Sequence, residues 1–254
     1  NVGDLPGHGG VRIGGGGSYD YDDSNQGNYN SFTGAVGEVV AYGVALPTAQ
    51  REILESSLGA KYGVGVANSR FDFAGTEEFD SGGDVVGVGQ RSDNAAPHDP
   101  TVVSDVLTVS PSASLTDGDF TLIGHNTASN TAFAAEDDIA DFRGDGATTT
   151  DDDVGSRLER TWRVDATGSA AFGYSDLTFD VSGLSLRDGQ EYLLLASSNP
   201  TFASGSTVVE GTVNSGTFVP DGTVHGSALA DAQYVTIART VGTPTGPTNL
   251  AYAP

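Results

Sequence analysis

The second half of the chain consists of short hydrophobic runs separated by turn-forming residues. Val, Thr, Ile, Phe and Tyr are concentrated in these runs, and Gly, Asp, Ser and Pro bound them. Such a pattern is typical of antiparallel β-sandwiches and barrels. We therefore predict an all-β fold, an antiparallel β-sandwich of jelly-roll or immunoglobulin-like type. The predicted strands are 85–89, 102–109, 120–123, 161–164, 177–181, 192–196, 207–213 and 234–238.

One segment near the N-terminus has helical spacing instead. Its apolar residues Ala49, Ile53, Leu54 and Leu58 recur at helical spacing. Pro47 suits the first turn of a helix, and Gly59 or Gly63 can end one. We predict a single short helix that begins at Pro47.

The remaining segments divide the chain further. A short apolar run over 36–42 predicts a strand before the helix, and the polar stretch 127–156 predicts a long loop. We expect three parts: residues 1–66 with the helix, a sandwich over 67–240, and a Pro-rich linker or arm over 241–254.

Charge narrows the classes of function. The chain has 11 Lys and Arg against 34 Asp and Glu, a net charge of −23, and Lys61 is its one lysine. Phosphate backbones repel such a chain, so we expect no nucleic-acid partner. Abundant Asp with almost no Lys is typical of proteins from salt-rich cells, where salt screens self-repulsion. An ordinary acidic secreted β-protein is the alternative.

Several residue types and patterns are absent from the sequence. Without Cys there is no disulfide framework and no thiolate metal site, and no apolar run has the ~18 residues of a membrane span. Because residue 1 is Asn and the chain has no Met, we expect it to be a piece of a longer protein. The four histidines are dispersed and no G-x-S-x-G motif occurs, so we expect no enzyme.

Calcium is the one cofactor that the sequence favours. Ca²⁺ binds six to eight oxygen ligands, and two Asp-rich loops offer carboxylates, although neither has the spacing of an EF-hand. A plain acidic surface remains the alternative. The candidate ligands are Asp20, Asp22 and Asp23 in the first loop, and Asp137, Asp138, Asp141, Asp145, Asp151, Asp152 and Asp153 in the second.

Residues 32–63 carry a first resemblance. The run FTGAVGEVVAY, followed by REILESSLGAKYG, resembles the closing segment of a laminin-G/concanavalin-A-like jelly roll in large secreted surface proteins of Bacteroidota. A complete jelly roll needs more strands than residues 1–66 supply. We therefore expect this segment to complete a sandwich elsewhere, either upstream or in another subunit.

A second resemblance covers the β-rich region that follows. VVGVGQRSD, RTWRV and QYVTIAR resemble the G-I-G-R-D-D, R-x-W-x-V and closing Y-F-T-[LF]-A signatures of a module of unknown function that follows the laminin-G segment in the same proteins. This resemblance implies an extracellular or cell-surface location and no catalytic activity. Alternation with Val164 predicts that Trp162 is a core residue rather than a sugar platform.

These observations favour a structural role. We expect an extracellular filament or cell-surface subunit, or a module of a large adhesin, in which identical subunits associate by strand addition at unpaired sheet edges. The alternative is a lectin-like module that binds glycans, with or without calcium.

Overall fold

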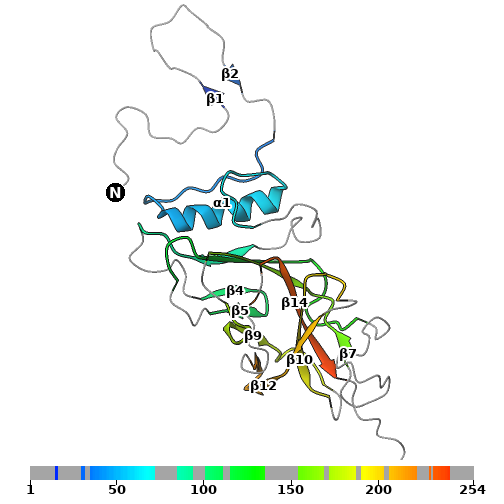
Figure 1. Cartoon of the computed structure of the whole chain (residues 1–254). Helices are drawn as coiled ribbons and strands as arrows, with labels where there is room; N and C mark the ends of the chain where they lie inside the picture. Colours follow the sequence, from blue (N-terminus) through cyan, green and yellow to red (C-terminus); the bar gives the residue numbers. More distant parts are fainter. Residues whose placement is uncertain are drawn as a thin grey trace, which may run out of the picture. The chain divides into compact units, whose positions relative to one another are not determined.

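The computed structural model describes most of the predicted sandwich and the helix (Figure 1). It divides into two compact units, Asn1–Leu46 and Pro47–Pro254. In the first unit, β1 (Gly15–Gly16) pairs antiparallel with β2 (Asn30–Ser31). The described residues are 35–71, 85–93, 101–110, 115–134, 154–168, 172–186, 190–202, 206–221, 229 and 231–240, with the backbone of 15–16 and 30–31.

The single predicted helix is confirmed. α1 spans Thr48–Tyr62 and begins directly after Pro47. It ends at Gly63, whose φ of 61° is the left-handed conformation that favours glycine. The Gly63 N–H donates to the Ala60 carbonyl and the Val64 N–H donates to the Gly59 carbonyl. Two carbonyl groups at the end of the helix thus have hydrogen-bond donors. The helix lies in the second unit, together with the sandwich, although we had expected it in a separate part over residues 1–66.

A seven-stranded antiparallel sheet forms one layer of the sandwich. Its central strand is β14 (Gln233–Thr240), which pairs with β10 on one side and with β8 and β7 on the other. The order is β11 (Thr207–Val209), β10 (Tyr192–Ser197), β14, β8 (Trp162–Thr167), β6 (Phe120–His125) and β3 (Val86–Gly89), with β7 (Val154–Arg157) beside β14.

A five-stranded antiparallel sheet forms the second layer. A short 3₁₀ helix, η2 (Tyr174–Asp176), leads directly into its central strand β9. The order is β12 (Gly211–Asn214), β13 (Thr217–Pro220), β9 (Leu177–Asp180), β5 (Leu107–Val109) and β4 (Val102–Ser104). The predicted all-β fold is thus confirmed.

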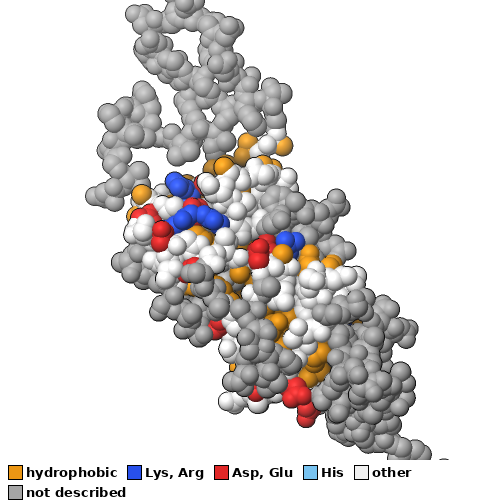
Figure 2. Space-filling model, viewed as in Figure 1, with side chains coloured by type: hydrophobic (Ala, Val, Ile, Leu, Met, Phe, Trp, Pro, Cys, Tyr) orange, Lys and Arg blue, Asp and Glu red, His pale blue; other side chains and the backbone are white. Residues whose placement is uncertain are grey.

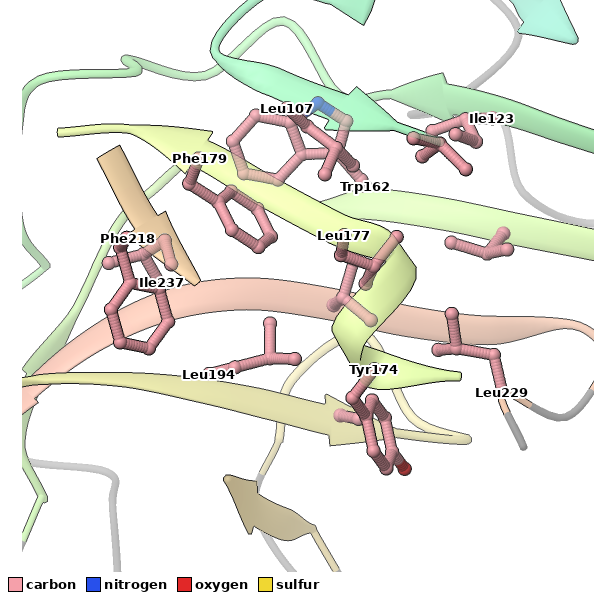
Figure 3. Packing of buried hydrophobic residues seen from close by; sticks show 14 of the residues in the cluster. Leu107, Ile123, Trp162, Tyr174, Leu177, Phe179, Leu194, Phe218, Leu229 and Ile237 are labelled. Carbon is pink, nitrogen blue, oxygen red and sulfur yellow. The ribbon is translucent and has the colours of Figure 1, made fainter. Parts of the chain in front are cut away.

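The main core lies between the two sheets (Figure 3). Trp162 of the larger sheet meets Phe179 of the smaller one edge-on, with 5.6 Å between ring centroids, and Phe179 in turn contacts Phe218. These three side chains are fully buried, so the prediction of a core role for Trp162 is confirmed. Burial of aromatic side chains at this density is a main stabilising contribution in a sandwich.

Two predicted strands each form two strands in the structure. Run 102–109 is interrupted by a tight turn at Asp105, whose φ is 60°, and becomes the β4–β5 hairpin. Run 207–213 becomes β11 and β12, which lie in different sheets because the chain crosses between the layers at Glu210. β13 was not predicted, and β7 occupies the end of the predicted loop 127–156.

The prediction of a strand over 36–42 was wrong. Residues 35–47 form no strand, because none of the described strands pairs with them. A strand needs a partner for its backbone N–H and C=O groups, and the apolar pattern alone does not supply one.

Candidate functional site

The segment VGVGQRSD over 86–93 holds the helix against the larger sheet. A Cβ on Gly89 would lie 2.2 Å from the ring of Phe120, and one on Gly87 would lie 2.7 Å from Leu122. Phe120 and Leu122 form a second apolar cluster with Ala49, Ile53, Ala60, Phe71 and Val85. The two glycines therefore make room for the side chains on which α1 packs.

An ion-pair cluster lies beside this apolar contact. The buried carboxylate of Glu52, on α1, accepts hydrogen bonds from Arg70 Nε at 3.1 Å and from Arg91 Nη2 at 2.8 Å. Both guanidinium groups also lie over the ring of Phe120, at 4.8 and 5.4 Å from its centroid. The hydrogen bond to Glu52 raises the pKa of Arg91. We call Glu52, Arg70 and Arg91 the helix latch.

Asp93 holds the N-terminus of the same helix. The backbone N–H and the hydroxyl of Thr48 both donate to Asp93 Oδ2, at 3.1 and 2.6 Å. A carboxylate at a helix N-terminus satisfies a free N–H and complements the helix dipole. These bonds lower the pKa of Asp93. The sequence signature over 86–93 is therefore explained as a helix-docking element.

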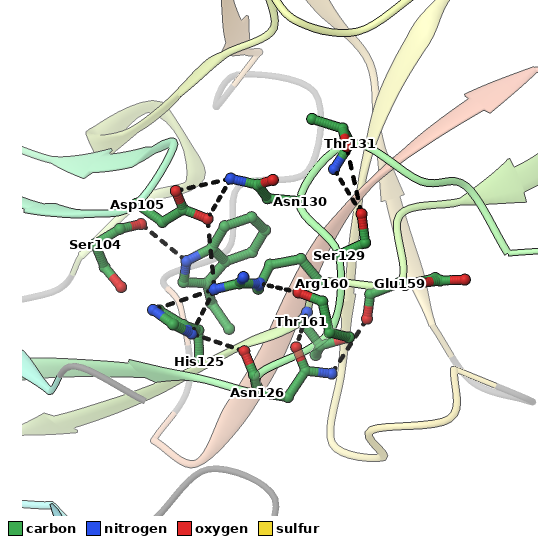
Figure 4. A network of polar contacts seen from close by, with 12 residues as sticks. Ser104, Asp105, His125, Asn126, Ser129, Asn130, Thr131, Glu159, Arg160 and Thr161 are labelled. Carbon is green, nitrogen blue, oxygen red and sulfur yellow. Dashed lines mark hydrogen bonds and ion pairs between the residues drawn. The ribbon is translucent and has the colours of Figure 1, made fainter. Parts of the chain in front are cut away.

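The R-x-W-x-V signature joins the two sheets at the turn of the β4–β5 hairpin (Figure 4). The indole N–H of Trp162 donates to the Ser104 carbonyl at 3.0 Å. Arg160 Nη1 lies 3.4 Å from Asp105 Oδ2, and its Nε donates to the Ala128 carbonyl at 2.7 Å. Alternate residues of one segment thus fasten the hairpin to the other sheet.

His125 completes this network. Its Nδ1 lies 2.7 Å from the Asn126 carbonyl oxygen and 2.6 Å from Arg160 Nη1, and its Nε2 lies 3.2 Å from the same Arg160 nitrogen. The histidine thus has a structural role.

Arginine is used mainly inside the fold. Five of the seven arginines in the described residues lie over aromatic rings, at 4.2–5.9 Å from a centroid: Arg70, Arg91, Arg157, Arg163 and Arg239. On the face in Figure 2, blue side chains lie beside red ones. A planar guanidinium stacks and forms forked hydrogen bonds in a way that an ammonium group does not. Five of the chain's ten arginines are used in this way.

Residues 36–44 carry exposed apolar side chains. Half of the exposed large hydrophobic side chains among the described residues are gathered here, with exposed fractions of 42–74%. They are Val36, Val39, Val40, Tyr42 and Val44. The apolar run was visible in the sequence, but its exposure was not predicted.

The structure does not describe the predicted calcium ligands. Asp20, Asp22, Asp23, Asp137, Asp138, Asp141, Asp145 and Asp151–Asp153 all lie outside the described residues, so the calcium site stays a prediction. Within the ranges that the structure describes, no group of three or more His, Asp or Glu side chains is placed to hold a metal ion. In the same ranges, no helix combines the length and the hydropathy needed to cross a bilayer.

Comparison with known proteins gives a family. Residues 101–233 match the model of a domain of unknown function, DUF8202, which covers more than half of the chain. The chain belongs to the DUF8202 family. No curated protein and no solved structure matches it. The DUF8202 match begins just before β4 and ends at the first residue of β14, so α1, β3 and most of the central strand of the larger sheet lie outside the matched residues.

Proposed function

We propose that this chain is a non-catalytic structural module of an extracellular or cell-surface protein, and that it associates with other copies by strand addition through residues 35–46. The observation that carries the proposal is the exposure of Val36, Val39, Val40, Tyr42 and Val44 in a segment that none of the described strands pairs with. A cluster of exposed apolar side chains indicates an interaction surface.

The sequence of this segment suits an added strand. In an extended chain, alternate residues lie on opposite faces. One face would then carry Val36, Val40, Tyr42 and Val44 with Glu38, while the other carries mainly Ala and Gly. Added strands gain affinity from backbone hydrogen bonds and specificity from alternate side chains that enter pockets. A bulky apolar face opposite a small one supports that use.

Charge sets the conditions under which copies would meet. Two chains with a net charge of −23 repel each other strongly at low salt. In about 1 M salt the Debye length falls to ~3 Å, which removes most of this repulsion, and high salt also favours apolar burial. The acidic, lysine-poor composition supports a salty extracellular setting, where association is expected to be strongest.

Sedimentation velocity of the whole chain in 0.2 M and 3 M NaCl tests the proposal. We expect association that increases with salt, and its loss in the double variant Val40→Asp/Tyr42→Asp. Val64→Asp is a matched control, because Val64 is also exposed but lies outside the segment. A wild-type chain that stays monomeric in 3 M NaCl, or equal association of the wild type and the double variant, would overturn the proposal.

A further inference from the structure

The exposed segment over residues 35–45 is nearly a palindrome. Its sequence is AVGEVVAYGVA, with Val40 at the centre, and the three outermost residues on each side are the same in mirror order. They are Ala35, Val36 and Gly37 on one side and Ala45, Val44 and Gly43 on the other. We propose that this segment pairs antiparallel with the same segment of a second copy, about a twofold axis at Val40. The inference rests on the proposed function and names the strand that receives the segment.

Antiparallel pairing about Val40 places like residues opposite each other. Side chains that are directly opposite in such a pair lie on the same face and contact one another. Val36 then contacts Val44 of the second copy, and the two Val40 side chains contact each other. Gly37 lies opposite Gly43 of the second copy. The bulky side chains of both strands therefore gather on one face of the ribbon, and mainly Ala and Gly lie on the other.

Other ways of pairing the same two segments fit less well. A shift by one residue would place Gly37 opposite Val44 or Tyr42, and the bulky residues of the two strands would lie on opposite faces. A parallel pairing in register would bring the two Glu38 residues to neighbouring positions, about 4.8 Å apart.

The proposed register keeps these carboxylates apart instead. Each Glu38 lies opposite Tyr42 of the second copy, whose hydroxyl can donate to a carboxylate. The two Glu38 residues are then offset by four positions, which is about 14 Å at ~3.4 Å per residue. This separation exceeds the Debye length of ~8 Å at physiological ionic strength. The charge on the segment thus favours the antiparallel pair.

The described sheet edges are too short to be equally good partners. Five strands of the two larger sheets pair on one side only, and each has three or four residues: β3, β4, β7, β11 and β12. An eleven-residue strand added to one of them would leave most of its backbone groups without a partner. A second copy of residues 35–45 has the matching length.

The segment must become ordered to form this pair. Residues 35–42 have no regular structure, and Gly43 and Val44 form a bend. A Cβ on Gly43 would have no atom within 4 Å, so close packing at this glycine does not fix the bend. Ordering costs conformational entropy, and a ribbon of two strands is only marginally stable in water. We therefore expect a dimer that forms in high salt, where repulsion between the chains is screened.

Cysteine crosslinking of the whole chain tests the register, since the natural chain has no Cys. Opposite residues of an antiparallel pair have Cα atoms about 4.5–5.5 Å apart, which suits a disulfide. After oxidation in 3 M NaCl, we expect Val40→Cys to form a disulfide-linked homodimer. Val36→Cys alone should give at least tenfold less, because its two copies lie eight positions apart, or about 27 Å.

Mixed chains provide the second half of the test. An equal mixture of Val36→Cys and Val44→Cys should give a heterodimeric disulfide in at least tenfold higher yield than either variant alone. Val64→Cys is the control for random collision, because Val64 is exposed but lies outside the segment. A pair of identical surfaces closes at two copies, so sedimentation velocity of the wild type should show a dimer and no larger species.

The possible outcomes separate this inference from the proposed function. Equal homodimer yields from Val36→Cys and Val40→Cys would indicate parallel pairing. Such yields overturn the inference and leave the proposed function standing, provided that Val40→Asp/Tyr42→Asp still abolishes association. The same holds if all crosslinks stay at the Val64→Cys level, or if the wild type forms larger species that this double variant abolishes. Wild-type chains that stay monomeric in 3 M NaCl overturn both.

Discussion

Replacing Glu52 by Gln tests the helix latch with little change of shape. The carboxylate accepts hydrogen bonds from Arg70 Nε and from Arg91 Nε and Nη2, over distances of 2.8–3.2 Å. Gln keeps one acceptor oxygen but presents an NH₂ group to two guanidinium groups. The variant therefore loses the ion pairs and places donors against donors.

The expected loss in the free energy of unfolding depends on how deeply the Glu52 ion pairs are buried. Removing one partner of a fully buried ion pair costs about 3–5 kcal/mol, because the other charge stays buried. Here the Arg70 and Arg91 side chains remain 19% and 25% exposed, so water can solvate them again. Gln also keeps some hydrogen bonding. We expect the free energy of unfolding to fall by about 2 kcal/mol.

Urea denaturation followed by tryptophan fluorescence measures this loss. Trp162 is the one tryptophan and is fully buried in the core, so its emission reports unfolding of the sandwich. Amide hydrogen exchange over 48–62 shows whether α1 detaches before the sheets unfold. Urea is uncharged and leaves ion pairs unscreened.

Glu55→Gln is the matched control on the same helix. Its partner Arg51 lies 3.8 Å away, and both side chains are about half exposed, so the expected loss is below about 0.5 kcal/mol. If Glu52→Gln lowers the free energy of unfolding no more than Glu55→Gln and leaves exchange over 48–62 unchanged, the latch does not stabilise the fold as argued.

Three further predictions concern the docking of α1 and the predicted calcium site. Gly89→Ala places a Cβ against the buried Phe120 ring and should lower the free energy of unfolding, measured by urea denaturation, by about 2 kcal/mol. Gly43→Ala is the control, because nothing lies near its Cβ, and it should leave this free energy unchanged. Equal effects of the two variants would contradict the helix-docking role of Gly89. The pKa of Asp93 is lowered in the folded chain, so its contribution to stability is present above the unfolded value near 3.8 and is lost as pH falls through the folded pKa. Exchange in the first turn of α1 should therefore show a pH-dependent difference between wild type and Asp93→Asn that disappears in acid, and parallel pH profiles would refute this. Calcium should raise the melting temperature above that in EDTA, measured in 3 M NaCl, and Asp151→Asn/Asp152→Asn/Asp153→Asn should abolish the rise; an unchanged melting temperature in the wild type removes the predicted site.

The sequence was sufficient for the fold class and for most strands. Short hydrophobic runs bounded by Gly, Asp, Ser and Pro predicted strands that pair in sheets, and the spacing from Ala49 to Leu58, with Pro47 before it and Gly63 after it, predicted one helix. It also predicted that Trp162 lies in the core, because its neighbours alternate. These features depend on local propensity and periodicity, which a single sequence contains.

Helix packing was less predictable than the helix itself. Leu54 and Leu58, which the spacing placed on the apolar face, are only half-buried, while Glu52 and Ser56 are buried. A polar residue enters an apolar face when distant residues satisfy it, as Arg91 satisfies Glu52 from 39 positions away. No local pattern records such a partner.

The two sequence signatures could be recognised from the sequence, but their structural roles could not be predicted from it. VGVGQRSD and R-x-W-x-V were recognisable as patterns, but their roles depend on Phe120, Glu52, Thr48 and Ser104, which lie elsewhere in the chain. The exposure of residues 36–44 was equally hidden, because an apolar strand pattern is the same whether or not a partner strand is present. Composition and periodicity determined what the chain can form, whereas pairing across long sequence separations decided which arginines and glycines hold it together and which apolar segment is left exposed.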